Sequence, residues 1–404
     1  MFSFVRKNTD EIRASRTLRL YGFFLFIPHV ATWFFWNWGF PLDERLASGA
    51  DCWPFFPSCD LIRPSILPWV MPTQWLYLIF SILGALLFLK RRTVTAAWWV
   101  LLAVSAYKLL VTAQDYRFMG NYHYIPNFMN LLFLFVPGKI LAARWFLVVI
   151  YVSAGLLKFN SEWLTGRAYF REILLPGALV PFASLLAVVL EMFVSFFLLS
   201  RNRGLFSLAL ASFVAFHIFS YHLVGFFYPV VMLSLLSIFA LAWWLRELPP
   251  AESEWSMRGF GFRARAVFCL GLILLQAVPL LSPGDPALTG QGRTFALNMF
   301  DSFSRCEPLV LREREREWVD FSEKRNDVGV RIHCDPILYL GQARQLCREP
   351  GTEVTLGLVS KRSGEQIQHL IALEPQTCQK KLSFHLFLSN DWIRSTPLDP
   401  FARR

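Results

Sequence analysis

The stretch ALVPFASLLAVVLEMFVSFFLLS, residues 178–200, contains one charged side chain, Glu191, among its 23 residues. A helix of about 20 apolar residues is long enough to cross the hydrocarbon core of a lipid bilayer. The length and composition of this stretch therefore predict a transmembrane helix that carries a single acidic residue.

Eight further apolar stretches occur in the first 282 residues. The chain is therefore predicted to form a membrane α-helical bundle of about nine spans, at residues 18–37, 73–90, 94–113, 124–137, 144–158, 178–200, 204–221, 223–244 and 265–282. The fourth and fifth stretches are short, and Pro126 and Asn130 make the fourth the weakest. A multi-pass protein embedded in the bilayer is the expected class.

The density of charged residues divides the chain into two domains. Residues 1–282 contain 36 charged residues, whereas the 122 residues at 283–404 contain 33. The second density matches that of soluble domains, in which about 25% of residues are charged. We therefore predict a transmembrane domain at 1–282 and a separate water-exposed domain at 283–404.

Residues 283–404 predict a small α+β domain. Alternating apolar residues at 353–359 and 367–373 indicate two strands around a turn at Ser363-Gly364. A helix is expected over Pro336–Arg348, because Asp335 is a suitable N-cap and Pro is favoured at the first helical position.

Basic residues orient the bundle. With nine spans, 16 of the 23 Lys and Arg residues before position 283 fall on one side, which the positive-inside rule assigns to the cytoplasm. The N-terminus is then cytoplasmic and residues 283–404 are extracytoplasmic, as in a protein of a bacterial inner membrane. The net charge of +11 follows from this topology and does not indicate a nucleic-acid partner.

The cysteines agree with this orientation. Cys269 falls in the ninth span, and the other six all fall on the predicted outer side: Cys52, Cys59, Cys306, Cys334, Cys347 and Cys378. Thiols in an extracytoplasmic compartment favour disulfides. A zinc site is the weaker alternative, because the sequence contains no CxxC pair.

Ionisable side chains within the spans are the candidates for a functional site, because such groups are costly in a bilayer. They are Lys108, His123, Lys158, Glu191, His217 and His222, accompanied by Tyr116, Tyr122 and Tyr124 near the outer ends. Since Lys158, His123 and His222 occur at the outer ends of their spans, we expect them to line one pocket that opens outward.

Each candidate also has a structural alternative. Lys108 would snorkel or pair with a carboxylate, and Lys158 would only snorkel to the outer headgroups. Glu191 would be a structural partner of one of these cations. His29 is expected to be a satisfied histidine inside its span. His217 and His222 are five residues apart and do not share one helix face, so no metal site is predicted.

One motif carries a resemblance to a known family. Residues 151–166, YVSAGLLKFNSEWLTG, are similar to the signature of the vitamin K-dependent gamma-glutamyl carboxylases and their bacterial relatives, the HTTM (horizontally transferred transmembrane) proteins. Four further stretches, at 120–124, 190–201, 216–232 and 335–373, resemble family segments in the same order. The resemblance covers most of residues 15–380.

The resemblance implies chemistry at a reduced naphthoquinone of the vitamin K or menaquinol type. In these lyases, oxidation of the quinone to its epoxide by oxygen drives addition of carbon dioxide to glutamate side chains of a peptide or protein. The resemblance assigns Lys158 as the catalytic base and His123 to stabilisation of the intermediate. It places Tyr122, Tyr151, Trp163 and His217 around the quinone, supported by Glu191 and Asn121, and it implies no metal.

The resemblance also implies a long-range disulfide. In the animal carboxylases a bridge joins the first outer loop to the outer domain, and Cys59 and Cys347 are at the closest matching positions. The alternative is a local Cys52–Cys59 bridge, which would leave Cys347 for Cys306, Cys334 or Cys378.

Three functions remain open from the sequence. The first is a membrane carboxylase of this kind. The second is an HTTM protein that uses the same pocket for another quinone-linked redox or peptide-maturation reaction. The third is a non-catalytic membrane protein that binds lipid or assists assembly.

Overall fold

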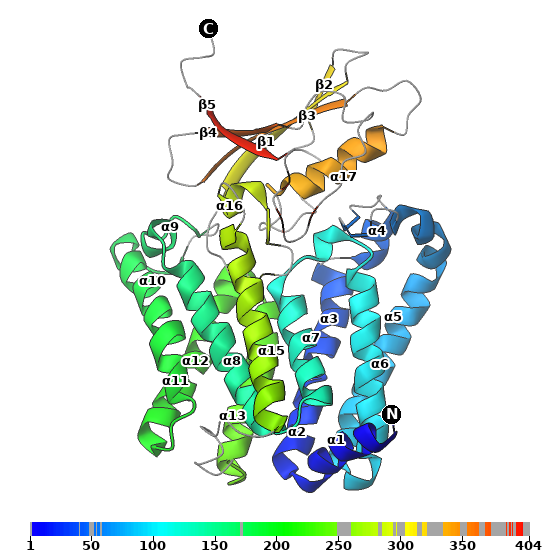
Figure 1. Cartoon of the computed structure of the whole chain (residues 1–404), viewed down its shortest axis with the longest axis vertical. Coiled ribbons are helices and arrows are strands. Elements are labelled where there is room, and N and C mark those ends of the chain that lie inside the picture. The colour runs from blue at the N-terminus through cyan, green and yellow to red at the C-terminus, as the bar shows by residue number, and fades with distance from the viewer. Residues whose placement is uncertain are drawn as a thin grey trace.

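The computed structural model of the chain describes two parts, a helical bundle and a smaller sheet with one helix. The described residues are 2–39, 41–47, 52–53, 55–56, 59–169, 173–248, 260–281, 285–293, 296, 304–312, 317–320, 334–347, 354–362, 368–372, 385, 388, 390 and 393–398. The sheet lies beyond one end of the bundle, and the N-terminus lies at the opposite end (Figure 1).

The bundle contains long apolar helices joined by short turns. In chain order its helices, short ones included, are α1 (Phe2–Ala14), α2 (Arg16–Phe24), α3 (Ile27–Phe34), α4 (Leu42–Ala47), α5 (Cys59–Leu89), α6 (Val94–Thr112), α7 (Asn121–Phe135), α8 (Lys139–Lys158), α9 (Ser161–Leu164), α10 (Val180–Val189), α11 (Ser195–Phe197), α12 (Arg203–Val224), α13 (Phe227–Trp244) and α15 (Phe260–Ala277). The short helix α16 (Pro286–Thr289) follows and contacts the sheet.

Eight helical segments in the described residues are long and apolar enough to cross a membrane, which identifies the chain as a multi-pass membrane protein. They correspond to eight of the nine predicted spans. The remaining one, at 124–137, corresponds to α7, which has only 15 residues and a length of about 22 Å. A bilayer core is about 30 Å thick, so α7 is too short to meet the same criterion.

Helix α7 nevertheless carries the chain back through the bundle. It packs against α6, α8 and α13. Its first residues lie at the end near the sheet, and α8 starts at the opposite end, where the Lys139 amide donates to Glu11 of α1 at 2.8 Å (Figure 1). The N-terminus and the sheet are therefore at opposite ends of the bundle.

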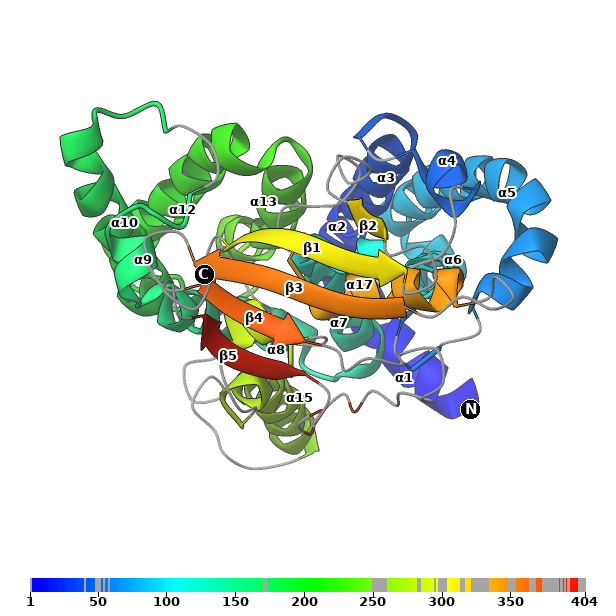
Figure 2. The same ribbon diagram turned by 90° about the horizontal axis from the view of Figure 1, so that it is seen from above.

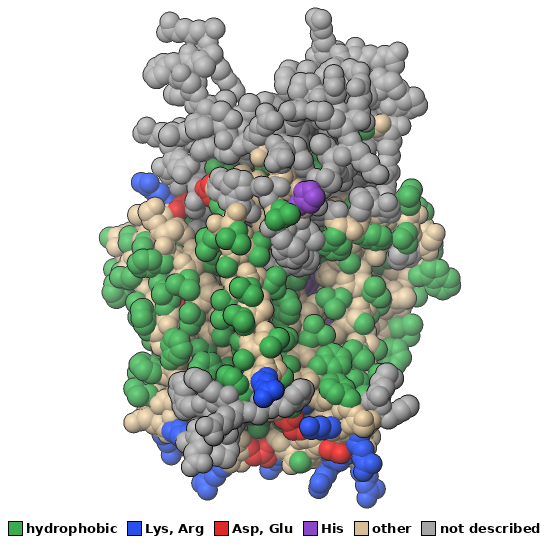
Figure 3. All heavy atoms as spheres, in the orientation of Figure 1, with side chains coloured by type: hydrophobic (Ala, Val, Ile, Leu, Met, Phe, Trp, Pro, Cys, Tyr) green, Lys and Arg blue, Asp and Glu red, His purple; other side chains and the backbone are tan. Residues whose placement is uncertain are grey.

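The outer surface of the bundle is suited to lipid. Large apolar side chains such as Trp69, Phe182, Leu208 and Val267 are more than 60% exposed. Figure 3 shows hydrophobic side chains over the flank of the bundle and Lys and Arg gathered at the end that carries the N-terminus. A surface of this kind is stable only when its apolar belt is covered by hydrocarbon.

Two π-helical turns interrupt the regular helices. One, η1 (Phe35–Gly39), continues α3, and the other, η5 (Leu190–Val194), joins α10 to α11. A π turn holds an extra residue within the helix and redirects the side chains that follow. Each of these turns carries residues beside a buried polar group of the bundle.

The second part contains a five-stranded antiparallel sheet in the order β2-β1-β3-β4-β5. Its strands are β1 (Ser304–Arg312), β2 (Glu317–Asp320), β3 (Val354–Arg362), β4 (Gln368–Ala372) and β5 (Arg394–Leu398), and it packs on α17 (Pro336–Leu346). Viewed from above, the sheet spreads across the end of the bundle (Figure 2).

Three of these elements match the sequence predictions. Strands β3 and β4 occupy the two predicted stretches, and α17 begins at the predicted residue. Asp335 acts as its N-cap, because its Oδ1 accepts a hydrogen bond from the Ile337 amide at 3.0 Å. The predicted turn at Ser363-Gly364 lies outside the described residues.

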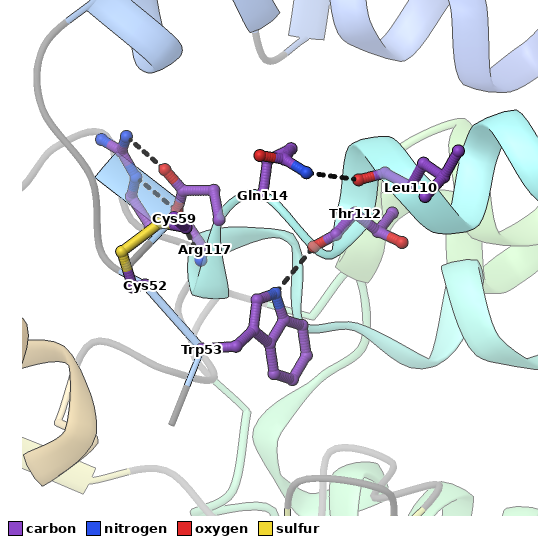
Figure 4. Close-up of a disulfide and its surroundings, with 8 residues drawn as sticks. Cys52, Trp53, Cys59, Leu110, Thr112, Gln114 and Arg117 are labelled. Carbon is purple, nitrogen blue, oxygen red and sulfur yellow. Dashed lines mark hydrogen bonds and ion pairs between the residues drawn. A yellow bond between two sulfur atoms is a disulfide. The ribbon is translucent and has the colours of Figure 1, made fainter. Parts of the chain in front are cut away.

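The prediction of a long-range disulfide between Cys59 and Cys347 is wrong. Cys59 is bonded to Cys52, with a Cα–Cα distance of 5.6 Å (Figure 4). Cys306 is bonded to Cys334. Cys347 also takes part in a disulfide, whereas Cys378 lies outside the described residues. Cys52 and Cys59 are only seven positions apart, so local chain geometry brings them together without help from residues 283–404.

Packing and a hydrogen bond join the two parts instead. The short loop closed by Cys52–Cys59 carries Trp53, whose indole donates to the Thr112 carbonyl at the end of α6 at 2.7 Å (Figure 4). Trp53 packs with Tyr116 and Ile337, and the Tyr116 hydroxyl donates to Asp335 Oδ2 at 2.6 Å. This contact fixes α17 on the end of the bundle.

Candidate active site

Lys158 is the last residue of α8 and is only 4% exposed. Its Nζ donates to both carboxylate oxygens of Glu191, at 2.5 and 2.6 Å. Lys158 therefore does not snorkel toward the headgroups. It forms a buried ion pair with the one acidic residue of the span at residues 178–200.

The π turn η5 and a glycine bring Glu191 to Lys158. Glu191 is the second residue of η5, which lies directly against α8. A Cβ at Gly155 would lie 2.5 Å from Met192 Cγ and 3.2 Å from the Met192 amide nitrogen. Only glycine at this position lets α8 approach η5 closely enough for the ion pair.

The turn after Lys158 is built by the remaining residues of the motif. Asn160 caps α9, because its Oδ1 accepts from the Trp163 amide at 2.9 Å and its Nδ2 donates to the Leu157 carbonyl at 2.8 Å. Trp163 Nε1 then donates to the Ser184 carbonyl of α10 at 3.2 Å. Gly166 closes the turn with a positive φ of 79°, which favours glycine.

Aromatic rings complete the surroundings of the amine. Lys158 Nζ lies 5.1 Å from the centre of the Trp163 ring and 5.8 Å from that of Phe216. Rings at these distances stabilise a cation through their quadrupoles. The ammonium form therefore has a defined environment of one carboxylate and two aromatic faces.

A cavity of about 510 Å³ opens beside Lys158. Its walls come from α10, η5 and α12, closed by the first turn of α13, and they are mostly apolar. The lining residues are Lys158, Trp163, Tyr169, Ile173, Leu175, Ala183, Leu186, Ala187, Leu190, Val194, Ser212, Ala215, Phe216, Phe219, Ser220, Leu223, Val224 and Tyr228. The volume and the few polar groups are typical of a site for an apolar small molecule.

A buried tyrosine–histidine pair lies behind this wall. The Tyr151 hydroxyl and His217 Nε2 are 2.8 Å apart, and both side chains are buried. Tyr228, which lines the cavity, has its ring centre 5.8 Å from that of His217. Lys158 is close enough to His217 for an electrostatic interaction. The sequence candidates Tyr151, His217, Glu191, Trp163 and Lys158 therefore lie in one region.

His123 lies in a different place. It is buried near the start of α7, between the rings of Tyr122 and Phe227, whose centres are 4.7 and 5.6 Å away. Asn121 precedes it and is also buried. Among the residues that the structure describes, the cavity lining includes Lys158 but not His123 or His222, and His222 is exposed.

Sequence reasoning did not find most of the cavity wall. Tyr169 and Tyr228 contribute to it, but in the sequence Tyr169 falls between predicted spans and Tyr228 resembles any other aromatic residue of an apolar span. His29 was expected to have hydrogen-bond partners within the bundle, and it does: Tyr77 at 2.7 Å and Asn130 at 2.9 Å.

Lys108 neither snorkels to the headgroups nor pairs with a carboxylate, the two alternatives predicted for it. It is fully buried, and no described carboxylate forms an ion pair with it.

The geometry allows proton transfer within the Lys158–Glu191 pair. Two charges in apolar surroundings cost desolvation energy, which a shift of the proton from the amine to the carboxylate removes. The resulting neutral amine faces the cavity and can accept a proton from a bound molecule. No group of three or more His, Cys, Asp or Glu side chains within the described ranges could hold a metal ion.

Comparison of the chain with protein-family models, with curated proteins and with solved structures finds no match. The chemistry of this site is therefore inferred from its own residues.

Proposed function

We propose that this chain is a membrane enzyme that oxidises a reduced quinone in the cavity beside Lys158 and couples this reaction to carboxylation of glutamate side chains. Oxygen and carbon dioxide are the co-substrates, and a peptide or protein provides the glutamate. The proposal joins the resemblance of residues 151–166 to the carboxylase signature with the buried amine and its cavity.

The observation that carries the proposal is a buried lysine at the wall of a large apolar cavity. The cavity volume of about 510 Å³ suits a ring system with an apolar tail. Lys158 and the Tyr169 and Tyr228 side chains are polar groups on a wall otherwise formed mainly by aliphatic and aromatic residues. The residues present therefore fit a lipid-soluble quinone, which would supply the redox chemistry when bound.

In this mechanism the residues of the chain move and hold a proton. Glu191 takes the proton of Lys158, which leaves a neutral amine. The amine removes a proton from the hydroxyl group of the bound molecule, and Trp163 and Phe216 stabilise the ammonium that forms. The apolar wall excludes water from this exchange. Release of the Glu191 proton to solvent then restores the carboxylate–ammonium pair.

We also propose that residues 283–404 form an extracytoplasmic α+β domain and that the N-terminal end is cytoplasmic. The gathering of Lys and Arg at the N-terminal end of the bundle supports this orientation (Figure 3). An alkaline phosphatase fusion after Arg404 should be active, and fusions at Arg201 or Arg246 should be inactive. The reverse pattern would move the cavity mouth to the cytoplasmic side.

A direct assay tests the enzymatic proposal. The full chain in nanodiscs is supplied with reduced menaquinone, oxygen, isotope-labelled bicarbonate and a glutamate-rich peptide. Mass spectrometry should find labelled carboxyl groups on the peptide, and chromatography should find quinone epoxide. Both products should disappear in Lys158→Met and remain in Lys90→Met, whose side chain is exposed.

The other outcomes distinguish the remaining functions. Epoxide without carboxylated peptide would favour a different quinone-linked reaction at the same site. Neither product, together with no saturable binding of reduced quinone, would contradict the proposal and favour a non-catalytic membrane protein. Mass spectrometry of secreted peptides from cells with and without the chain would then identify a natural substrate.

A further inference from the structure

A second buried lysine lies in the bundle, away from the cavity. Lys108 of α6 has no exposed surface, and its Nζ has no hydrogen-bond partner among the described residues. An isolated ammonium at such a position costs several kcal/mol unless a counter-charge accompanies it. A charged Lys108 therefore needs a partner that the side chains around it do not provide.

The packing of α6 against α7 shows what faces this amine. The two helices are antiparallel, with Trp98 Nε1 bonded to the Leu134 carbonyl and Asn130 Nδ2 bonded to Ser105 Oγ. Continued by one turn from the Ser105–Asn130 contact, this antiparallel register puts Lys108 opposite Asn127. One more turn reaches His123, which shares a face of α7 with Asn127 at a spacing of four residues.

These facing residues are also without partners. Both ring nitrogens of His123 and both amide atoms of Asn127 are buried and form no hydrogen bond among the described residues. Buried polar atoms are nearly always hydrogen-bonded in folded proteins. Three such side chains on one helix–helix contact indicate a common ligand more readily than three independent defects.

Aromatic rings close the space around them. Lys108 Nζ lies 6.0 Å from the centre of the Phe227 ring, and the His123 ring centre lies 5.6 Å from the same point. The rings of Phe35 and Trp36, from the π turn η1, lie 6.0 and 6.3 Å from His123. Aromatic faces therefore surround both the amine and the imidazole.

The charged groups nearby do not neutralise Lys108. His29, which interacts electrostatically with it, is already bonded to Tyr77 and Asn130. Asp115, beyond the end of α6, is paired with Arg117 at 2.7 Å. Among the described residues, the cluster therefore presents an ammonium, an imidazole and an amide, with no acidic side chain paired to them.

We propose that Lys108, His123 and Asn127 form a binding site for a small monovalent anion, separate from the cavity beside Lys158. The ammonium supplies the charge, and the imidazole and amide N–H groups supply neutral donors. Halides and bicarbonate share the size and charge that this site selects. The inference does not depend on the proposed quinone chemistry.

Anion-dependent stability tests the site. The full chain in nanodiscs of neutral lipid is unfolded thermally while sodium gluconate is replaced by sodium chloride, bromide or bicarbonate at constant ionic strength. A ligand that binds the folded state raises the melting temperature in a saturable manner. We expect this for the small anions and not for gluconate, which is too large.

Variants assign the effect to Lys108. Lys108→Met, which removes a buried charge and should fold, is expected to abolish the saturable increase. Lys108→Arg should retain it, and His123→Gln should weaken binding about tenfold, as for loss of one charge-assisted contact. The matched control is Lys139→Met, because Lys139 is also buried but donates to Asn8 Oδ1 and to the Val136 carbonyl.

A direct measurement complements the melting curves. Chloride bound to the protein should broaden the chloride NMR signal, and bromide or bicarbonate should reverse the broadening by competition. Broadening should be lost in Lys108→Met and kept in Lys139→Met. The proposal is overturned if the unaltered chain shows no saturable anion effect, or if the effect survives in Lys108→Met.

Discussion

Lys158 and Lys108 are both buried in the same helical bundle beside aromatic rings, yet they differ in their counter-charge and in their access to a cavity. Lys158 is bonded to both oxygens of Glu191 and borders a cavity of about 510 Å³. Lys108 has no described partner and faces neutral side chains and aromatic rings. The chemistry open to a buried lysine thus depends on which side chains the neighbouring helix places opposite it.

The neighbouring helices explain the difference. Opposite Lys158, the π turn η5 and the missing Cβ of Gly155 bring a carboxylate into contact. Opposite Lys108, the regular helix α7 presents Asn127 and His123. A lysine with its own internal acid can exchange a proton with a bound molecule, whereas a lysine without one can stay charged only beside an external anion.

The largest expected effect is at Lys158. Lys158→Met should reduce quinone-dependent turnover by about 10³-fold or more, because it removes the proposed general base. The single variant also leaves Glu191 buried without a counter-charge, which costs about 3–5 kcal/mol. Turnover is measured by epoxide formation, and stability by thermal unfolding.

A double variant separates chemistry from folding at this pair. Lys158→Met combined with Glu191→Leu removes both charges and should recover most of the lost stability while turnover stays absent. If instead the stable double variant were active, Lys158 would not be the base and its difference from Lys108 would have no functional meaning.

A smaller effect is expected at Glu191. Glu191→Gln keeps the shape of the side chain but cannot take the proton of Lys158, so turnover should fall by roughly 10²-fold. Glu191→Asp, which keeps the carboxylate but shortens its reach, should lose less. Equal activity of Glu191→Gln and the unaltered chain would show that Glu191 acts only as a structural partner.

The approach of α8 to η5 is tested at Gly155. Gly155→Ala should lower turnover by about tenfold and stability by about 1–3 kcal/mol, because the added Cβ would overlap Met192. Gly271→Ala in α15 is the matched control, since a Cβ there meets nothing within 4 Å and alanine favours a helix. Equal behaviour of the two variants would refute the close-approach explanation.

A weaker effect is expected at Tyr151. Tyr151→Phe removes the hydroxyl bonded to His217 and should lower turnover by about three- to tenfold, in keeping with the free energy of one buried hydrogen bond. Tyr21→Phe is the control, because the Tyr21 hydroxyl is buried without a hydrogen-bond partner in the described residues. That control should be neutral in both activity and stability.

The smallest effect concerns the contact between the helix α17, which packs on the sheet, and the bundle. Burial raises the pKa of Asp335 above its usual value, although the hydrogen bonds from Tyr116 and the Ile337 amide oppose the shift. The folded state then holds this proton more tightly than the unfolded state. Stability should therefore decrease as pH rises from about 3.9 through the raised pKa, and then level off.

Asp335→Asn removes this dependence. Asparagine is an equally good N-cap through its side-chain oxygen, and its side-chain NH2 group can donate to the Tyr116 hydroxyl. Thermal unfolding between acidic and neutral pH should show a flatter profile in the variant. An unchanged profile would mean that another group titrates in this range. Burial also raises the pKa of Tyr116, so its hydroxyl remains a donor throughout.

Much of the fold is already determined by local sequence. Apolar stretches such as residues 178–200 predict spans because partitioning into a bilayer depends on composition over about 20 residues. The N-cap Asp335 and the strands β3 and β4 are likewise set by neighbouring residues. The sequence also singled out Lys158 and Glu191, because an ionisable group in a span is conspicuous by itself.

Only the tertiary structure decided which of these groups meet. Lys158 and Glu191 are 33 residues apart, and their contact depends on a π turn and a glycine whose effects appear only when α8 and η5 pack. The same packing separates His123 from that cavity and places it near Lys108. Long-range pairing depends on the relative position of helices, which side-chain packing fixes and composition does not.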